Sequence, residues 1–142
     1  MARVGLLTMS DGRASVHGDV EPFARGAEDR VAGALEAHGH EVLRGHEVVW
    51  TNEGAVSEAR RLAAARPDVT IFNIPVWAFP HFSMLAASET PGPLVLLSNL
   101  DPAYPGMVGL LAAAGALDQV GRVHARVCGD VDDPGLLAQL GV

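Results

Sequence analysis

The sequence has almost no cysteine and no long apolar segment. Cys128 is the only cysteine among 142 residues, so an internal disulfide is excluded and a reducing cytoplasm is the expected compartment. The chain starts with MARVGLLTMS, in which one arginine precedes a short apolar run. That run is too short for a signal peptide or a membrane span. We therefore expect a cytoplasmic protein with no membrane contact.

Positive charge is also scarce. Ten basic residues face 17 acidic ones, the net charge is −7, and no basic stripe occurs anywhere in the chain. This balance argues against a nucleic-acid partner. Hydrophobic residues make up 49% of the chain, which argues against disorder. The length suits one α/β domain over residues 1–142, with a sizeable core.

Several motifs that indicate a ligand-binding site are missing. No G-x-G-x-x-G follows the first apolar run, no Walker A sequence is present, and the first loop, Ser10-Asp11-Gly12-Arg13, has too few hydroxyls for a flavin phosphate loop. No H-x-x-x-H pair and no Cys–His cluster occur, so we expect no metal site within this chain. The histidines are expected at a solvent-facing helix–strand junction (His38, His40, His46), in loops (His17, His81) and in a strand (His124).

What the sequence does contain is an alternation of short apolar runs and amphipathic segments. Strands are predicted over residues 3–9, 41–49 (with an interruption at Gly45 left open), 69–73, 94–97 and 123–128. Helices are predicted over residues 20–38, 53–65, from 80 or 81 to before 91, 105–119 and 135–140. Repeated βαβ units predict a three-layer α/β/α domain with a five-stranded parallel, flavodoxin-like sheet. The strand order 2-1-3-4-5 is predicted by analogy with flavodoxin-like domains.

The stretch from Ile71 to Phe82, IFNIPVWAFPHF, combines a buried strand with a polar and aromatic loop. Pro75 and Pro80 cannot donate to a central ladder, so the chain leaves the sheet near Asn73. The aromatic residues that follow lie at the carboxyl end of a parallel strand, where open α/β sheets place ligands.

Two residues near this edge have the chemistry to contact a sugar. The indole of Trp77 can pack on a sugar or another flat apolar face, or it can fill a gap against a helix. Arg13 can bind a carboxylate, a phosphate or a hydroxyl, or remain an ordinary surface arginine. Because the first and third strands are neighbours in the predicted order, both side chains can face one crevice. His81 is a further candidate for a ligand contact, although an ordinary surface or packing role remains the simpler interpretation.

Other polar residues have simpler interpretations. Five aspartates fall in loops at the same edge: Asp11, Asp101, Asp130, Asp132 and Asp133. Paired carboxylates can perform acid–base work, but the aspartates are more simply loop and helix-capping residues. Cys128 ends an apolar strand and is expected to be an inert buried thiol.

The loop sequences, taken together, resemble the N-terminal domain of the L-fucose isomerase and L-arabinose isomerase family, closer to the fucose side. The segments that carry the resemblance follow the successive strands and span nearly the whole chain: Ser10-Asp11-Gly12-Arg13, Trp50-Thr51-Asn52-Glu53, Pro75-Val76-Trp77-Ala78-Phe79-Pro80, Ser98-Asn99-Leu100 with Tyr104-Pro105-Gly106-Met107-Val108-Gly109-Leu110, and Gly129-Asp130. Each motif alone is weak evidence for the family, but five motifs in the same order at the same strand ends are fairly specific for it.

The resemblance implies an aldose–ketose isomerase that moves a proton between C1 and C2 of an open-chain sugar. In this family, manganese or another divalent ion and the proton-transferring carboxylates lie in later domains, so this chain alone is expected to hold no cofactor and to be inactive. The domain would bind the sugar substrate across a boundary with other subunits or domains of a homo-oligomer. Arg13 and Trp77 match the sugar-contacting positions, and His81 and Asn99 join them as candidates.

Two other functions remain open. A free-standing module that binds a sugar or polyol would use the same strand edge. A flavodoxin-like electron carrier is disfavoured because a phosphate loop is missing. An excised domain, a proteolytic remnant and a separately encoded piece are equally compatible with the sequence.

Overall fold

A parallel five-stranded sheet organises the chain. The computed structural model describes residues 1–142. The strands are β1 (Arg3–Thr8), β2 (Glu41–Arg44), β3 (Val69–Asn73), β4 (Leu94–Ser98) and β5 (Ala125–Cys128), in the order β2-β1-β3-β4-β5. All four pairings are parallel, for example Leu6 beside Ile71 between β1 and β3. The predicted fold class and strand order are confirmed.

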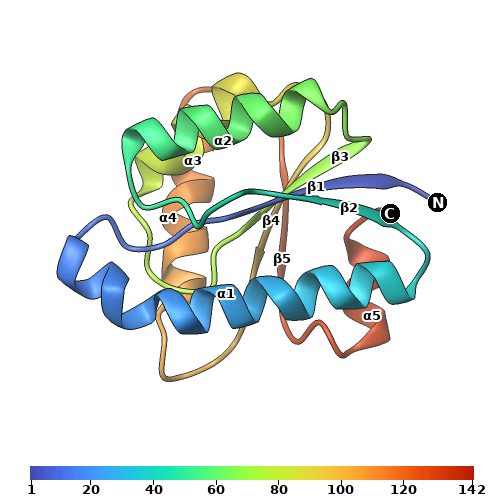
Figure 1. The fold of residues 1–142 in the computed structure, drawn as a ribbon, viewed down its shortest axis with the longest axis horizontal. Helices are drawn as coiled ribbons and strands as arrows, with labels where there is room; N and C mark the ends of the chain where they lie inside the picture. The colour runs from blue at the N-terminus through green and yellow to red at the C-terminus, as the bar shows by residue number, and fades with distance from the viewer.

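Five helices cover the two faces of the sheet. They are α1 (Ala14–Ala37), α2 (Asn52–Ala64), α3 (Pro80–Glu89), α4 (Gly106–Gln119) and α5 (Pro134–Gln139). Figure 1 shows α1 and α5 on one side of the sheet and α2 and α3 on the other. The inner residues of α4, among them Leu110 and Leu117, belong to the same buried cluster as those of α2 and α3. The result is the expected three-layer arrangement.

The core consists of two clusters, one on each face of the sheet. The cluster under α2, α3 and α4 includes Leu7, Phe72 and Leu96, while the cluster under α1 and α5 includes Leu6, Ile71 and Leu97. Neighbouring residues of one strand therefore face opposite layers, as the pleat requires. Because helices cover both faces of the sheet, the central strands are continuous apolar runs.

The first helix begins earlier than the sequence pattern predicts. α1 starts at Ala14 rather than near Val20, and Pro22 lies inside the helix. The pattern misplaced this start because residues 14–19 contain little apolar periodicity and because proline commonly marks a first helical turn. His17, which we expected in a loop, consequently lies in α1 and is buried.

Two strands are shorter than predicted by two residues or more. β2 ends at Arg44, and the chain returns to the sheet only at Val49, which forms an isolated bridge with Met9. The interruption left open at Gly45 is therefore present. β5 begins at Ala125, so His124 precedes the strand that was expected to contain it.

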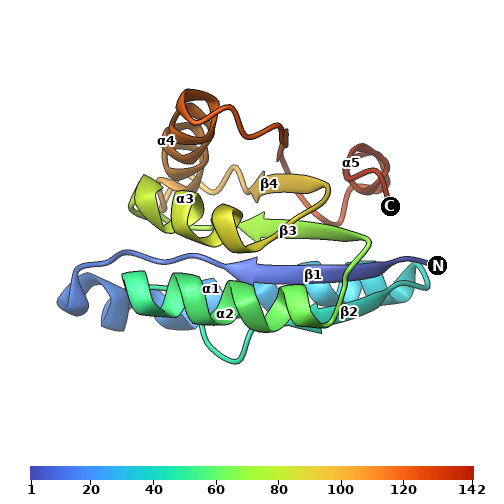
Figure 2. The ribbon, with the colours of Figure 1, turned by 90° about the horizontal axis from the view of Figure 1, so that it is seen from above.

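The carboxyl ends of the strands meet at one edge of the molecule. Figure 2 shows β1, β3 and β4 side by side with their arrowheads at the same end, whereas both chain termini lie at the other end. The loops that follow β1, β3, β4 and β5 are therefore neighbours. None of the helices combines the length and apolar character that a membrane crossing needs.

Candidate functional site at the carboxyl edge of the sheet

The loop after β1 holds an arginine in a fixed position. Asp11 is buried, and its Oδ1 accepts hydrogen bonds from the backbone N–H and from Nε of Arg13, both at 2.9 Å. Its Oδ2 accepts from Nη2 of Arg13 at 2.6 Å. This bidentate pair lowers the pKa of the Asp11 carboxyl, chiefly through the side-chain hydrogen bond from Arg13. The Arg13 side chain remains 61% exposed, so its guanidinium is oriented and still accessible to a ligand.

A glycine brings this loop against the loop that follows β3. A Cβ atom on Gly12 would lie 2.4 Å from ring atoms of Phe79 and 2.9 Å from Phe82, so only glycine permits this close approach. Phe79 also stacks on His81, with ring centroids 5.4 Å apart. His81, which we expected in a loop, is the second residue of α3. The loop that carries Arg13 therefore contacts the segment that leads into α3 and carries His81.

Trp77 lies in the middle of the β3–α3 loop and is half-buried. The backbone on its N-terminal side is held by the end of β4 and the loop after it. Ser98 Oγ, at the last residue of β4, donates to the Ile74 carbonyl at 2.7 Å. Asn99 Nδ2 donates to the Pro75 carbonyl at 3.0 Å. The structure thus shows Asn99, predicted from the sequence as a substrate contact, bonding to the backbone of the Trp77 loop.

Helix α4 approaches the same loop through two glycines. A Cβ atom on Gly106 would lie 2.6 Å from the Pro75 carbonyl oxygen, and one on Gly109 would lie 2.9 Å from the Val76 carbonyl oxygen. The segment Tyr104 to Leu110, singled out in the sequence, therefore contains the residues that allow α4 to pack on the backbone next to Trp77. Its glycines serve contact between elements, and they do not form a phosphate-binding loop.

Sequence reasoning missed a buried polar stack next to the first loop. His17 stacks on Trp50 with centroids 4.7 Å apart and an interplanar angle of 5°. Its Nδ1 lies 2.8 Å from Ser10 Oγ, and its Nε2 lies 3.6 Å from Glu21. The sequence analysis would have found this stack only with the correct start of α1, because a helix that begins at Ala14 places His17 on its inner side. Because Ser10 is completely buried, this Ser–His–Glu arrangement offers no accessible nucleophile.

The aspartates of the edge bond to neighbouring groups. Asp130 and Asp132 both pair with Arg30, Asp133 accepts from the Gly135 N–H at the start of α5, and Asp101 accepts from the Ala103 N–H. These bonds agree with the loop and capping roles. No three histidine, cysteine or acidic side chains come together in an arrangement suited to a metal ion.

Cys128 is half-buried at the end of β5, and its thiol donates to the Asn99 carbonyl at 3.4 Å. Burial raises the pKa of this thiol, so the neutral, less reactive form is favoured at neutral pH.

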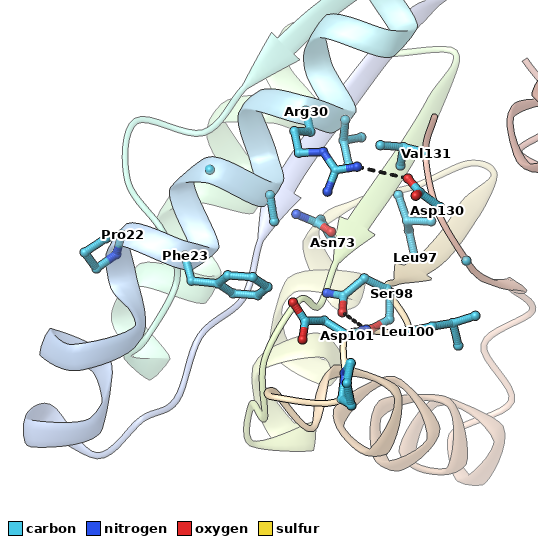
Figure 3. A pocket seen from close by; sticks show the side chains of 16 residues that line it. Pro22, Phe23, Arg30, Asn73, Leu97, Ser98, Leu100, Asp101, Asp130 and Val131 are labelled. Atoms are coloured by element: carbon cyan, nitrogen blue, oxygen red, sulfur yellow. Dashed lines mark hydrogen bonds and ion pairs between the residues drawn. The ribbon is translucent and has the colours of Figure 1, made fainter. Parts of the chain in front are cut away.

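A cleft of about 880 Å³ lies beside these loops, on the α1 side of the sheet. It is bounded by α1 and by the chain segments at the ends of β3, β4 and β5 (Figure 3). Of the four predicted site residues, Asn99 lines this cleft, whereas Arg13, Trp77 and His81 do not. The edge therefore has two regions: the contacting loops after β1 and β3, and the cleft.

Comparison with known proteins identifies one family. Residues 1–137 match the sequence model of the family described as "L-fucose isomerase, first N-terminal domain". No protein with a curated description matches the chain.

Proposed function

The chain belongs to the family of the first N-terminal domain of L-fucose isomerase, and we propose that it serves as the substrate-recognition domain of a metal-dependent aldose–ketose isomerase of that type. Such an enzyme transfers a proton between C1 and C2 of an open-chain sugar, and manganese or another divalent ion holds the adjacent oxygens. The donor groups in this chain do not suit such an ion. We therefore assign metal binding and proton transfer to other domains, and sugar recognition to this one.

The contact between the loops after β1 and β3 is the observation that supports this role. Gly12 lets the Asp11–Arg13 segment pack against Phe79, two residues beyond Trp77. Asp11 occupies Nε and Nη2 of Arg13, which leaves Nη1 free to donate to a hydroxyl or carbonyl oxygen of a sugar. The indole of Trp77 supplies an apolar face of the kind that packs on sugar C–H groups.

Two loops on one edge suit a site that is completed by another chain. Neither loop encloses a ligand by itself, so in this proposal the sugar lies between these loops and a domain or subunit that carries the catalytic groups. The complete enzyme would then be a cytoplasmic homo-oligomer in which this domain contributes to assembly as well as to recognition.

The experiment compares variants of the complete isomerase, in which this domain is joined to its catalytic domains. We expect Trp77→Ala to lower kcat/KM by about 10- to 200-fold, because one packing contact with the substrate is lost, while metal affinity stays unchanged. Arg13→Ala should act in the same way. Arg25→Ala is the matched control, since Arg25 is exposed on α1 and pairs only with Glu21. An unchanged kcat/KM in the Trp77 variant would contradict the proposal.

A further inference from the structure

We propose that the cleft on the α1 side of the sheet is a separate binding site for an uncharged polyhydroxy ligand, such as a sugar in its ring form. The cleft volume of about 880 Å³ lies within the range of about 300–1,000 Å³ that is usual for small-molecule sites. Arg13, Trp77 and His81 take no part in its walls. Binding there is therefore independent of the recognition role proposed for those residues.

An incompletely paired amide lies at the bottom of the cleft. Asn73, the last residue of β3, is only 3% exposed. Its Nδ2 donates to Thr8 Oγ1 at 3.2 Å, but its Oδ1 accepts no hydrogen bond within the chain. Figure 3 shows the amide between Arg30 and Ser98, at the cleft. This oxygen is not completely buried, so it is free to accept a hydrogen bond from a ligand hydroxyl in the cleft.

The charged groups at the cleft favour a ligand that donates hydrogen bonds over a ligand that carries negative charge. Arg30 is the one basic residue of the lining, and its Nη2 bonds both Asp130, at 2.9 Å, and Asp132, at 2.7 Å. Asp101 uses Oδ1 to accept from Ala103, and Oδ2 takes no hydrogen bond from the chain. Free acceptors of this kind suit hydroxyl groups, whereas the surplus of carboxylates repels a phosphate.

The remaining walls are apolar. Phe23 extends from α1 into the cleft (Figure 3), and its ring is held by stacking on Tyr104 with centroids 3.8 Å apart. Val31, Leu97 and Val131 are buried side chains of the lining. Aromatic and aliphatic side chains together with carboxylate and amide acceptors match a molecule with C–H faces and a rim of hydroxyls.

The test is an NMR titration of the amide signals of the purified chain. L-fucose serves as the uncharged probe and a hexose phosphate as the anionic one. We expect saturable binding of L-fucose with Kd on the order of 1 mM, with shifts centred on Gly26, Asn73 and Gly129, and much weaker binding of the phosphate. Absence of saturable sugar binding, or preference for the phosphate, would overturn the proposal.

A blocking variant locates the site. Gly26 lines the cleft, and a Cβ atom there meets nothing within 4 Å, so Gly26→Leu fills the cleft while improving the helix propensity of α1. We expect it to weaken L-fucose binding by at least about tenfold. Gly33→Leu is the matched control, because Gly33 is equally open on the same helix and lies outside the cleft.

The same titration separates this site from the proposed recognition loops. Binding that survives Gly26→Leu but is lost in Trp77→Ala would place the sugar at the loops, which would overturn the cleft site and support the proposed function. Binding lost in Gly26→Leu and retained in Trp77→Ala is the expected result. Asp101→Ala provides a second cleft variant at an exposed position, and we expect it to weaken binding as well.

Discussion

Asn99 donates a hydrogen bond from its side-chain amide to the backbone carbonyl of Pro75, at 3.0 Å. This bond joins the loop after β4 to the loop that carries Trp77, and Asn99 also lines the cleft. One side chain therefore connects the two regions of the carboxyl edge. Its Oδ1 accepts from the Asp101 N–H at 2.8 Å, so both ends of the amide are fixed.

We predict that Asn99→Ala loosens the Trp77 loop. The Pro75 residue is buried, and a buried carbonyl that loses its donor costs about 1–3 kcal/mol in the free energy of unfolding. Urea unfolding measures this cost. In a Trp50→Phe background Trp77 is the only tryptophan, and its emission should shift in the Asn99 variant.

The control for this prediction is Asn52→Ala, since Asn52 is exposed at the start of α2 and its side chain makes no hydrogen bond within the chain. We expect this change to alter stability by less than about 0.5 kcal/mol. An Asn99 variant as stable as the Asn52 variant, with unchanged Trp77 emission, would show that the bond to Pro75 does not hold the loop.

A pair of glycines on α4 tests how closely this helix must approach the loop. In Gly106→Ala the new methyl group would lie 2.6 Å from both the Pro75 oxygen and Ser98 Oγ. We expect a loss of about 1–3 kcal/mol in the free energy of unfolding, because the packed backbone must shift. Gly115→Ala on the same helix meets nothing within 4 Å, and it should gain about 0.5–1 kcal/mol from helix propensity. Equal effects of the two changes in thermal or urea unfolding would refute the close-contact role of Gly106.

The Asp11–Arg13 pair predicts a pH dependence of stability. The pKa of Asp11 is lowered in the folded state, mainly by the hydrogen bond from the Arg13 side chain. The stability that this shift supplies is fully present above the unfolded value of about 3.9 and is lost as the pH falls through the lowered folded value. In Arg13→Leu the Asp11 pKa should rise, because burial then acts without its compensating partner.

NMR titration of the Asp11 carboxyl measures this pKa directly. Urea unfolding at several pH values should show a stability difference between wild type and Arg13→Leu that shrinks towards acid pH. Arg25→Leu is the control, since it removes an exposed guanidinium from α1, the helix that follows Arg13, and leaves Asp11 untouched. An Asp11 pKa that does not move in the Arg13 variant would contradict the assigned cause.

Much of the fold was predictable because it depends on local patterns. The continuous apolar runs of β1, β3 and β4 indicated strands that are buried on both faces, and Pro75 and Pro80 marked the end of β3. Thr51, a residue type that commonly caps helices, lies just before α2, and its side chain accepts from the Gly54 N–H. The predicted start of α1 was wrong because Pro22 lies inside the helix and the first turns of the helix lack an apolar stripe.

The candidate site was predictable only in part. The residue types and the edge of the sheet followed from the sequence, because the carboxyl ends of parallel strands share one edge. The sequence did not predict three other features of the site: the bond of Asn99 to Pro75, the stack of His17 on Trp50 and the cleft beside Asn73. Each of these joins segments that are far apart in the sequence, and periodicity carries no information about such distances.

The sequence by itself therefore determined the class of fold and the family, because these follow from the succession of apolar runs and from short motifs at strand ends. The strand order was predicted by analogy with flavodoxin-like domains. Only the tertiary structure decided that Gly12 meets Phe79, that Gly106 meets Pro75, and that α1 stands away from β4 and β5 to leave a cleft. The physical reason is that these relationships depend on how whole helices pack on a twisted sheet, where a single Cβ atom sets the distance between two elements.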